Sequence, residues 1–310
     1  MARYLVTGGA GFIGSNIVEA LVQSEEEVRA VDNFITGKKE NLDLFRNKIE
    51  FIEGDIREKA FCDKAVQGID FVLHQAALPS VERSIVDPGL TAEINILGTL
   101  NLLFASSRAG VKRFIFASSS SVYGDHPLQP KKEGVEGAPL SPYAVSKHAG
   151  EMYCQVFSEI YELPTVCLRY FNVFGPRQDP TSHYSAAIPI FIRRILDGQP
   201  PIIFGDGEQT RDFTYVKNVV KANLLAVEAD DVSGEVFNIA CGQGISVNSM
   251  AKRIITKIGQ NFQPEHDQPR SGEVRHSTAK ITKAENKLGY KPDISFKEGL
   301  NRTIEWYRKQ

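Results

Sequence analysis

The stretch Gly8-Gly9-Ala10-Gly11-Phe12-Ile13-Gly14 decides the fold class of this chain. It follows the apolar segment Tyr4–Thr7 and opens the helical pattern Ile13–Gln23, so a buried strand is expected to pass through a tight turn into a helix. Its first, fourth and last residues are glycines, which permit the turn and let the backbone approach a bound group closely. The free N–H groups at the start of the helix favour a pyrophosphate.

Short apolar segments alternate with helical patterns through the first half of the chain. The expected strands are Tyr4–Thr7, Val28–Asp32, Ile49–Glu53, Phe71–His74, Phe114–Ala117 and Thr165–Tyr170. The expected helices between them include Ile13–Gln23, Thr91–Ala109 and Tyr143–Tyr161. Strands that are apolar throughout and separated by helices indicate a parallel sheet covered on both faces. The sequence therefore predicts an α/β fold with a doubly wound parallel sheet of the Rossmann type.

An acidic residue follows the glycine stretch at the distance that a dinucleotide site requires. Asp32 ends the second expected strand, 18 residues after Gly14, where a carboxylate accepts hydrogen bonds from the adenosine ribose hydroxyls. The same carboxylate repels a 2′-phosphate, so NAD is favoured over NADP although Lys38 and Lys39 lie nearby. Asp55, after the third expected strand, suits the adenine amino group. These residues predict NAD as the cofactor.

The pattern loosens after about residue 175, where prolines become frequent and short strands and helices mix up to Trp306. We expect residues 1–175 to form the NAD-binding Rossmann domain, with return segments near 211–240. Residues 176–310 are expected to form mainly a smaller α/β substrate domain over the carboxyl ends of the strands.

A Tyr-Lys pair and a serine run point to proton transfer. In Tyr143-Ala144-Val145-Ser146-Lys147 the two functional residues are four apart and share a helix face. A lysine ammonium and a positive nicotinamide would both favour the tyrosine phenolate. The serines of 118–121 end the fifth expected strand, at the edge where such sheets bind ligands. The candidate catalytic residues are Tyr143, Lys147, Ser119, Ser120 and Ser121.

Composition narrows the remaining classes. The formal net charge of the 310 residues is -2 and the basic residues are spread out, so neither nucleic acid nor an anionic membrane is expected as a partner. No apolar stretch approaches the roughly 20 residues of a membrane span, and no secretory signal is visible. The 4 cysteines are far apart, which predicts reduced thiols and a cytoplasmic protein. The 6 histidines lack ligand spacing, so no metal site is expected.

The motifs taken together resemble a known family over nearly the whole chain. The segments that carry the resemblance are Gly8–Gly14, His74–Ala77, Ser119–Gly124, Tyr143–Lys147, Arg169–Val173 and Thr210–Phe213. Their order and spacing are similar to those of UDP-galactose 4-epimerases in the extended short-chain dehydrogenase/reductase family, above all the subgroup acting on UDP-N-acetylglucosamine and its uronic acid. The resemblance implies C4 epimerisation of a UDP-hexose through a transient 4-keto sugar. It also implies a homodimer joined by a four-helix bundle of the helices expected at 91–109 and 143–161.

The resemblance assigns roles residue by residue. Cofactor contacts fall on Gly8, Gly11, Phe12, Ile13, Gly14, Asp32, Asn33, Gly37, Asp55, Ile56, Gln75, Ala76, Ala77, Asn95, Tyr143, Lys147 and Tyr170. Residues around the reacting sugar are Ser119, Ser120, Ser121 and Tyr143, and Ser80 is a further substrate contact. The other substrate contacts are Asn172, Gln178, Ala186, Ile202, Phe204, Arg211, Arg270, Glu273 and Ser277, of which Ile202 and Phe204 match the uracil pocket.

Three positions bear on the choice of sugar. The subgroup usually has aspartate where Glu273 stands and often glycine where Pro79 stands, near the sugar pocket. Ser277 matches a gate beside the C2 substituent, where family members restricted to UDP-glucose and UDP-galactose carry tyrosine. A small residue there predicts acceptance of the N-acetyl sugars, while the hexose and uronic acid pairs stay open.

Two other functions are considered. A nucleotide-sugar 4,6-dehydratase would carry an Asp-Glu pair at the positions of Ser120 and Ser121, and a UDP-glucuronate decarboxylase would carry glutamate at Ser121. A dinucleotide-sensing regulator without chemistry would be expected to lose Tyr143 or Lys147, and both are present. The residues of the site therefore favour an epimerase over either alternative.

Overall fold

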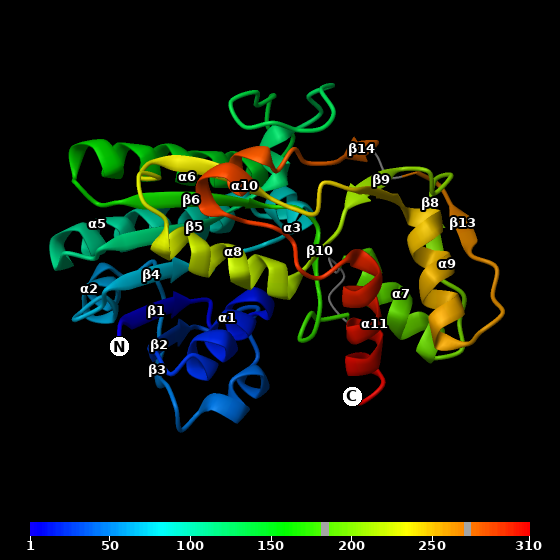
Figure 1. The fold of residues 1–310 in the computed structure, drawn as a ribbon, viewed down its shortest axis with the longest axis horizontal. Helices are drawn as coiled ribbons and strands as arrows, with labels where there is room; N and C mark the ends of the chain where they lie inside the picture. Colours follow the sequence, from blue (N-terminus) through cyan, green and yellow to red (C-terminus); the bar gives the residue numbers. More distant parts are fainter. Residues whose placement is uncertain (181–185, 270–273) are drawn as a thin grey trace.

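The computed structural model describes residues 1–180, 186–269 and 274–310. Its main sheet has seven parallel strands in the order β11-β6-β5-β4-β1-β2-β3 (Figure 1). The strands are β1 Arg3–Thr7, β2 Glu27–Asp32, β3 Glu50–Glu53, β4 Phe71–His74, β5 Arg113–Ser119, β6 Thr165–Tyr170 and β11 Glu235–Ile239. The predicted doubly wound α/β fold is confirmed.

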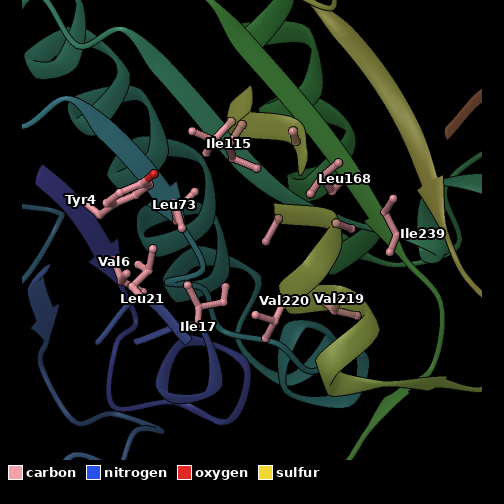
Figure 2. Close-up of a cluster of buried hydrophobic side chains, with 14 of the residues drawn as sticks. Tyr4, Val6, Ile17, Leu21, Leu73, Ile115, Leu168, Val219, Val220 and Ile239 are labelled. Carbon is pink, nitrogen blue, oxygen red and sulfur yellow. The ribbon is translucent and has the colours of Figure 1, made fainter. Parts of the chain in front are cut away.

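Helices cover both faces of the sheet because its strands are apolar on both sides. One face carries α1 Phe12–Gln23, α8 Val216–Glu228 and α10 Thr282–Leu288, and the other carries α2 Lys59–Ala65, α5 Thr99–Ala109 and α6 Pro142–Ile160. On the first face, Ile17 and Leu21 of α1 and Val219 and Val220 of α8 pack around strand residues such as Leu73 (Figure 2). These side chains are almost completely buried, and a second apolar core fills the other face, between the sheet and α2, α5 and α6.

A smaller unit with its own apolar core lies beside the sheet, at the right of Figure 1. Its elements are α7 Ala187–Leu196, β8 Ile202–Phe204, β9 Thr210–Asp212, β12 Gly244–Ser246, α9 Val247–Ile258, β13 Glu265–Asp267, β14 His276–Ser277 and α11 Phe296–Tyr307. The short strands β7 Val173–Phe174 and β10 Thr214–Tyr215 pair with each other where the chain passes between the two parts. β11 belongs to the main sheet, and α8 and α10 pack on it. The chain therefore returns to the large unit after it has entered the smaller one.

The helix expected over Thr91–Ala109 is broken into pieces. It begins earlier, as α4 Pro88–Ala92, because the Asp87 side chain accepts a hydrogen bond from the backbone N–H of Leu90. The short helix α3 Val81–Val86 precedes α4. A wider π-helical stretch spans Glu93–Gly98, between α4 and α5. The wide turn lets the Asn95 amide accept from Leu78 N at 2.7 Å and donate to Ser146 Oγ at 3.0 Å.

Among the described residues, no helix is both long enough and apolar enough to cross a bilayer. The cysteines are all free thiols, and Cys62, Cys154 and Cys167 are buried while Cys241 is half-buried. Burial raises the pKa of Cys62 and of Cys241 to about 12, so these two sulfurs are poor nucleophiles near neutral pH.

A buried ion pair ties the ends of the central strands to α6. Arg169 of β6 donates from Nε and Nη2 to the Glu151 carboxylate of α6, both at 2.7 Å. Ser118 of β5 donates its hydroxyl to the same carboxylate, and Glu136 contacts Arg169 from the other side. Both members of the pair are about 97% buried, so the carboxylate holds three elements in register next to the edge of the sheet.

Glu151→Ala should destabilise the protein by about 3–5 kcal/mol, because it leaves the Arg169 guanidinium buried without its main partner. Urea unfolding followed by circular dichroism measures the change. The control is Glu298→Ala, which breaks an exposed i,i+4 pair with Arg302 and should cost less than about 1 kcal/mol. Equal losses in the two variants would contradict the role given to Glu151.

Candidate active site

A cavity of about 740 Å³ runs along the carboxyl edge of the main sheet. Its walls come from the segments that follow β1, β2, β3, β4, β5 and β6, together with the first turn of α6. It brings together the following predicted residues: Gly8, Gly11, Phe12, Ile13, Gly14, Asp32, Asn33, Gly37, Asp55, Ile56, Gln75, Ala76, Ala77, Ser80, Ser119, Ser120, Tyr143, Tyr170, Asn172, Gln178 and Ala186.

The glycine turn forms part of the cavity wall and is closely packed against its neighbours. Gly8 has φ +64°, and a Cβ there would lie 2.8 Å from the backbone nitrogen of Ala76. A Cβ on Gly14 would lie 2.1 Å from the carbonyl oxygen of Gly8. Only glycine fits at these two positions, and the exposed backbone that results is the cradle a dinucleotide pyrophosphate needs.

The acidic end of the cavity lies beyond β2 and β3. The Asp32 carboxylate accepts from the backbone N–H of Ala10 at 3.0 Å and of Phe34 at 2.8 Å, and burial raises its pKa. The Asp55 carboxylate receives hydrogen bonds from the Arg57 guanidinium, which lowers its pKa. Asp32 is thus held by fixed donors at the position where ribose hydroxyls would meet it.

Tyr143 and Lys147 lie in the first turns of α6. The helix begins after Ser141, whose hydroxyl accepts from Ala144 N at 3.1 Å. Lys147 Nζ donates to the carbonyl oxygen of Ala117 at 2.8 Å and lies 5.9 Å from the centre of the Tyr143 ring. Burial lowers the pKa of Lys147 to about 8. Burial raises the pKa of Tyr143, while a hydrogen bond with Ser119 lowers it.

The serine run divides at the end of β5. Ser119 and Ser120 line the cavity, and the Ser119 hydroxyl also accepts from Ser121 N at 3.1 Å. Ser121 lies behind the wall, and its buried hydroxyl has no hydrogen-bond partner among the described residues. The reacting end of the cavity therefore presents the Tyr143 phenol beside the Ser119 hydroxyl, with Ser120 next to them.

Several predicted residues lie away from the cavity wall: Asn95, Ser121, Lys147, Ile202, Phe204, Arg211 and Ser277. The Asn95 side chain accepts a hydrogen bond from the backbone N–H of Leu78, which lines the cavity. Arg211 and Ser277 are register partners on β9 and β14 of the smaller unit, so the structure places these two together. The predicted contacts Arg270 and Glu273 lie outside the described residues.

Two side chains outside the cavity wall support the site: Asn223, which no motif marks in the sequence, and His74, which opens the segment His74–Ala77. Asn223 of α8 donates to the Tyr170 hydroxyl at 2.9 Å and fixes a ring that lines the cavity. His74 is completely enclosed, with its ring nitrogens 2.7 Å from Thr7 Oγ1 and 2.9 Å from Thr99 Oγ1. Burial lowers the pKa of His74 to about 3, so this imidazole is neutral and structural.

The fold and the cavity, with its glycine turn and buried acid, are those of a dinucleotide-binding protein. The family described as NAD dependent epimerase/dehydratase matches residues 4–240. The chain belongs to this family, and NAD is its cofactor. The glycine cradle, the buried Asp32 and the Tyr143 turn all fit that cofactor.

Similar proteins agree in length and shape. The putative UDP-glucose 4-epimerase of Methanocaldococcus jannaschii is 42% identical over 306 residues, which covers 98% of each chain. The UDP-glucose 4-epimerase of Thermotoga maritima, solved with UDP-glucose, has a TM-score of 0.95, 42% identity and 99% coverage of both chains. The UDP-N-acetylglucosamine 4-epimerase of Methanobrevibacter ruminantium, solved with UDP-N-acetylmuramic acid, has a TM-score of 0.96 and 41% identity, and covers 100% of this chain and 99% of that one.

Asp32→Ala should weaken NAD binding by about 10-fold or more, because hydrogen bonds to a charged group are worth about 1.5–3 kcal/mol. The same change should reduce discrimination against NADP, since the repelling carboxylate is gone. Calorimetric titration with both cofactors measures the two effects. Asp43→Ala, at an exposed acid outside the cavity wall, is the control, and equal behaviour of the two variants would remove Asp32 from the cofactor site.

Proposed function

We propose that this chain inverts C4 of UDP-N-acetylglucosamine and UDP-N-acetylgalactosamine, with UDP-glucose and UDP-galactose as a second pair. The observation that carries the proposal is that Tyr143 and Ser119 line the same cavity as the glycine cradle. The likeness over nearly all of the chain to proteins named as UDP-sugar 4-epimerases supports it.

The residues of the chain would handle the proton and hold the substrate. Tyr143 takes the proton from the sugar 4-hydroxyl and later returns it, while Ser119 holds that oxygen by a hydrogen bond. Bound NAD would supply a reversible store for the C4 hydride. Lys147, fixed to the Ala117 carbonyl, holds a positive charge next to the tyrosine when it is protonated.

The UDP part of the substrate is assigned to the smaller unit. Arg211 and Ser277 lie on paired strands there, and the Arg211 guanidinium can fork onto phosphate oxygens. Anchoring the UDP leaves the 4-keto sugar free to turn over and present its other face. Dehydratase chemistry is disfavoured because Ser120 and Ser121 offer hydroxyls where an acid and a base would be needed.

Tyr143→Phe should reduce turnover by at least the ~10²-fold typical of a lost general base, because the ring is kept and only the hydroxyl is removed. UDP-sugar binding should survive. Product formation from UDP-N-acetylglucosamine and calorimetric binding test the two parts. Tyr153→Phe, on the same helix, is the matched control. Near wild-type turnover in Tyr143→Phe would end the proposed mechanism.

Ser277 is proposed as the gate for the C2 substituent. Ser277 is half-buried on β14. Its small side chain leaves room for the acetamido group at C2 to pass when the keto sugar rotates. Ser277→Tyr should abolish activity on the N-acetyl sugars and spare UDP-glucose and UDP-galactose, since overfilling a packed site costs roughly 1–3 kcal/mol. Rates on the two substrate pairs measure the effect, and equal loss on both would exclude a gate at this position.

A homodimer is proposed through the outer face of α5 and α6, which pack side by side. Large apolar side chains are exposed over this face and the turn before it, between 41% and 70% of their surface: Leu97, Phe104, Val145, Met152, Val156 and Ile160. An exposed apolar patch of this kind is typical of an interface, and two copies would form a four-helix bundle. Sedimentation equilibrium should therefore give twice the chain mass of 34.4 kDa, and Met152→Glu should restore the monomer.

A further inference from the structure

An exposed ion pair joins two walls of the main cavity. Lys38 Nζ lies 2.9 Å from Asp179 Oδ2, and both residues belong to the cavity wall. The two side chains are 49% and 32% exposed, so the pair lies at the mouth of the cavity and not in its depth. It connects segments that are far apart in the sequence, because Lys38 follows β2 and Asp179 follows β7.

The strand order shows what lies between these two segments. In the main sheet, β2 and β6 are separated by β1, β4 and β5, and β7 follows β6 closely in the chain. Neighbouring strands are about 4.8 Å apart, so the ends of β2 and β6 are about 19 Å from each other. The two segments therefore reach toward each other across the carboxyl ends of the strands between them, including β1, which leads into the glycine turn.

Both segments are fixed beside that turn. On one side, the backbone N–H of Lys38 donates to the carbonyl oxygen of Ala10, inside the turn, at 3.0 Å. On the other side, the Asn16 amide donates to the carbonyl oxygen of Pro176 at 3.2 Å, and Asn16 belongs to the helix that the turn opens. The ion pair thus closes a bridge over the cradle in which a dinucleotide pyrophosphate binds.

We propose that Lys38 and Asp179 form a clasp that retains bound NAD. The ion pair has to open before the cofactor enters or leaves, and it can stay closed during turnover. A reaction that returns its hydride to the same NAD is helped by such a clasp, whereas an enzyme that exchanges its cofactor in every cycle would be slowed by it. This advantage rests on the proposed function, while the clasp itself requires only that NAD is the cofactor.

The test is the exchange of NAD on the loaded protein. Protein that carries radiolabelled NAD is diluted into excess unlabelled NAD, and the label retained is followed with time. Asp179→Asn should release the label about 2–5-fold faster than the wild type, which is the range that an exposed ion pair allows. Lys38→Gln should do the same. The double variant should be no faster than either single variant, because the same pair is broken in all three.

The matched control is Asp293→Asn, which breaks a similar exposed pair with Lys221 outside the cavity wall and should leave exchange unchanged. Unaltered release in Asp179→Asn, or an equal effect in the control, would overturn the proposal. Slower release in Asp179→Asn would overturn it as well, because it would mean that Asp179 only draws Lys38 away from the pyrophosphate.

A clasp differs from a direct contact with the cofactor in its effect on the equilibrium. Because the pair hinders entry and exit alike, the Kd for NAD, from equilibrium dialysis of the loaded protein, should change less than the release rate. A Kd that weakens by the same factor as release accelerates would overturn the clasp.

The wild type gives an independent measurement. Salt screens an exposed ion pair, so raising the ionic strength should speed NAD release from the wild type more than from Asp179→Asn. An equal salt dependence of the two proteins would show that the ion pair is not a barrier to exchange.

Discussion

The approach of the Gly8 backbone to the Ala76 backbone is the contact on which the site depends. β1 and β4 are parallel neighbours, so their carboxyl ends leave the sheet side by side and their two turns compete for the same space. A side chain at Gly8 would meet the Ala76 nitrogen at 2.8 Å and force the turns apart. With glycine there, both backbones can form one continuous wall, and the ends of β2, β5 and β6 extend it on either side.

Burial acts on the acid-base residues in opposite directions. It raises the pKa of Tyr143 and lowers the pKa of Lys147 to about 8, so both groups are pushed toward their neutral forms. Glu151, one helical turn beyond Lys147 and held by Arg169, counters this by raising the Lys147 pKa. The Ser119 hydrogen bond counters it at Tyr143. The protonation balance at Lys147 is therefore set in part by Glu151, a group that never needs to touch the substrate.

Local spacing explains how much of the site could be predicted from the sequence. The glycine turn, Asp32 and the Tyr143–Lys147 turn each depend on a strand end or a helix period, which neighbouring residues determine. The role of Asn223 depends on which elements meet in space, and no short pattern marks it. The break in the helix expected at 91–109 was missed for the same reason, since the wide turn at Glu93–Gly98 accompanies a contact of Asn95 with Leu78, 17 residues away in the sequence.

The position of β11 has a consequence for how the chain assembles. β11 forms the outer edge of the main sheet by pairing with β6, with Glu235 opposite Val166. Everything from β7 to α8 lies between these two strands in the sequence, so the sheet cannot be completed until α7, β8 and β9 of the smaller unit have left the ribosome. A fragment that stops after β6 would carry an open, apolar strand edge, which is a template for aggregation. The two parts of this molecule are therefore one folding unit, and neither can be cut out and expected to stand alone.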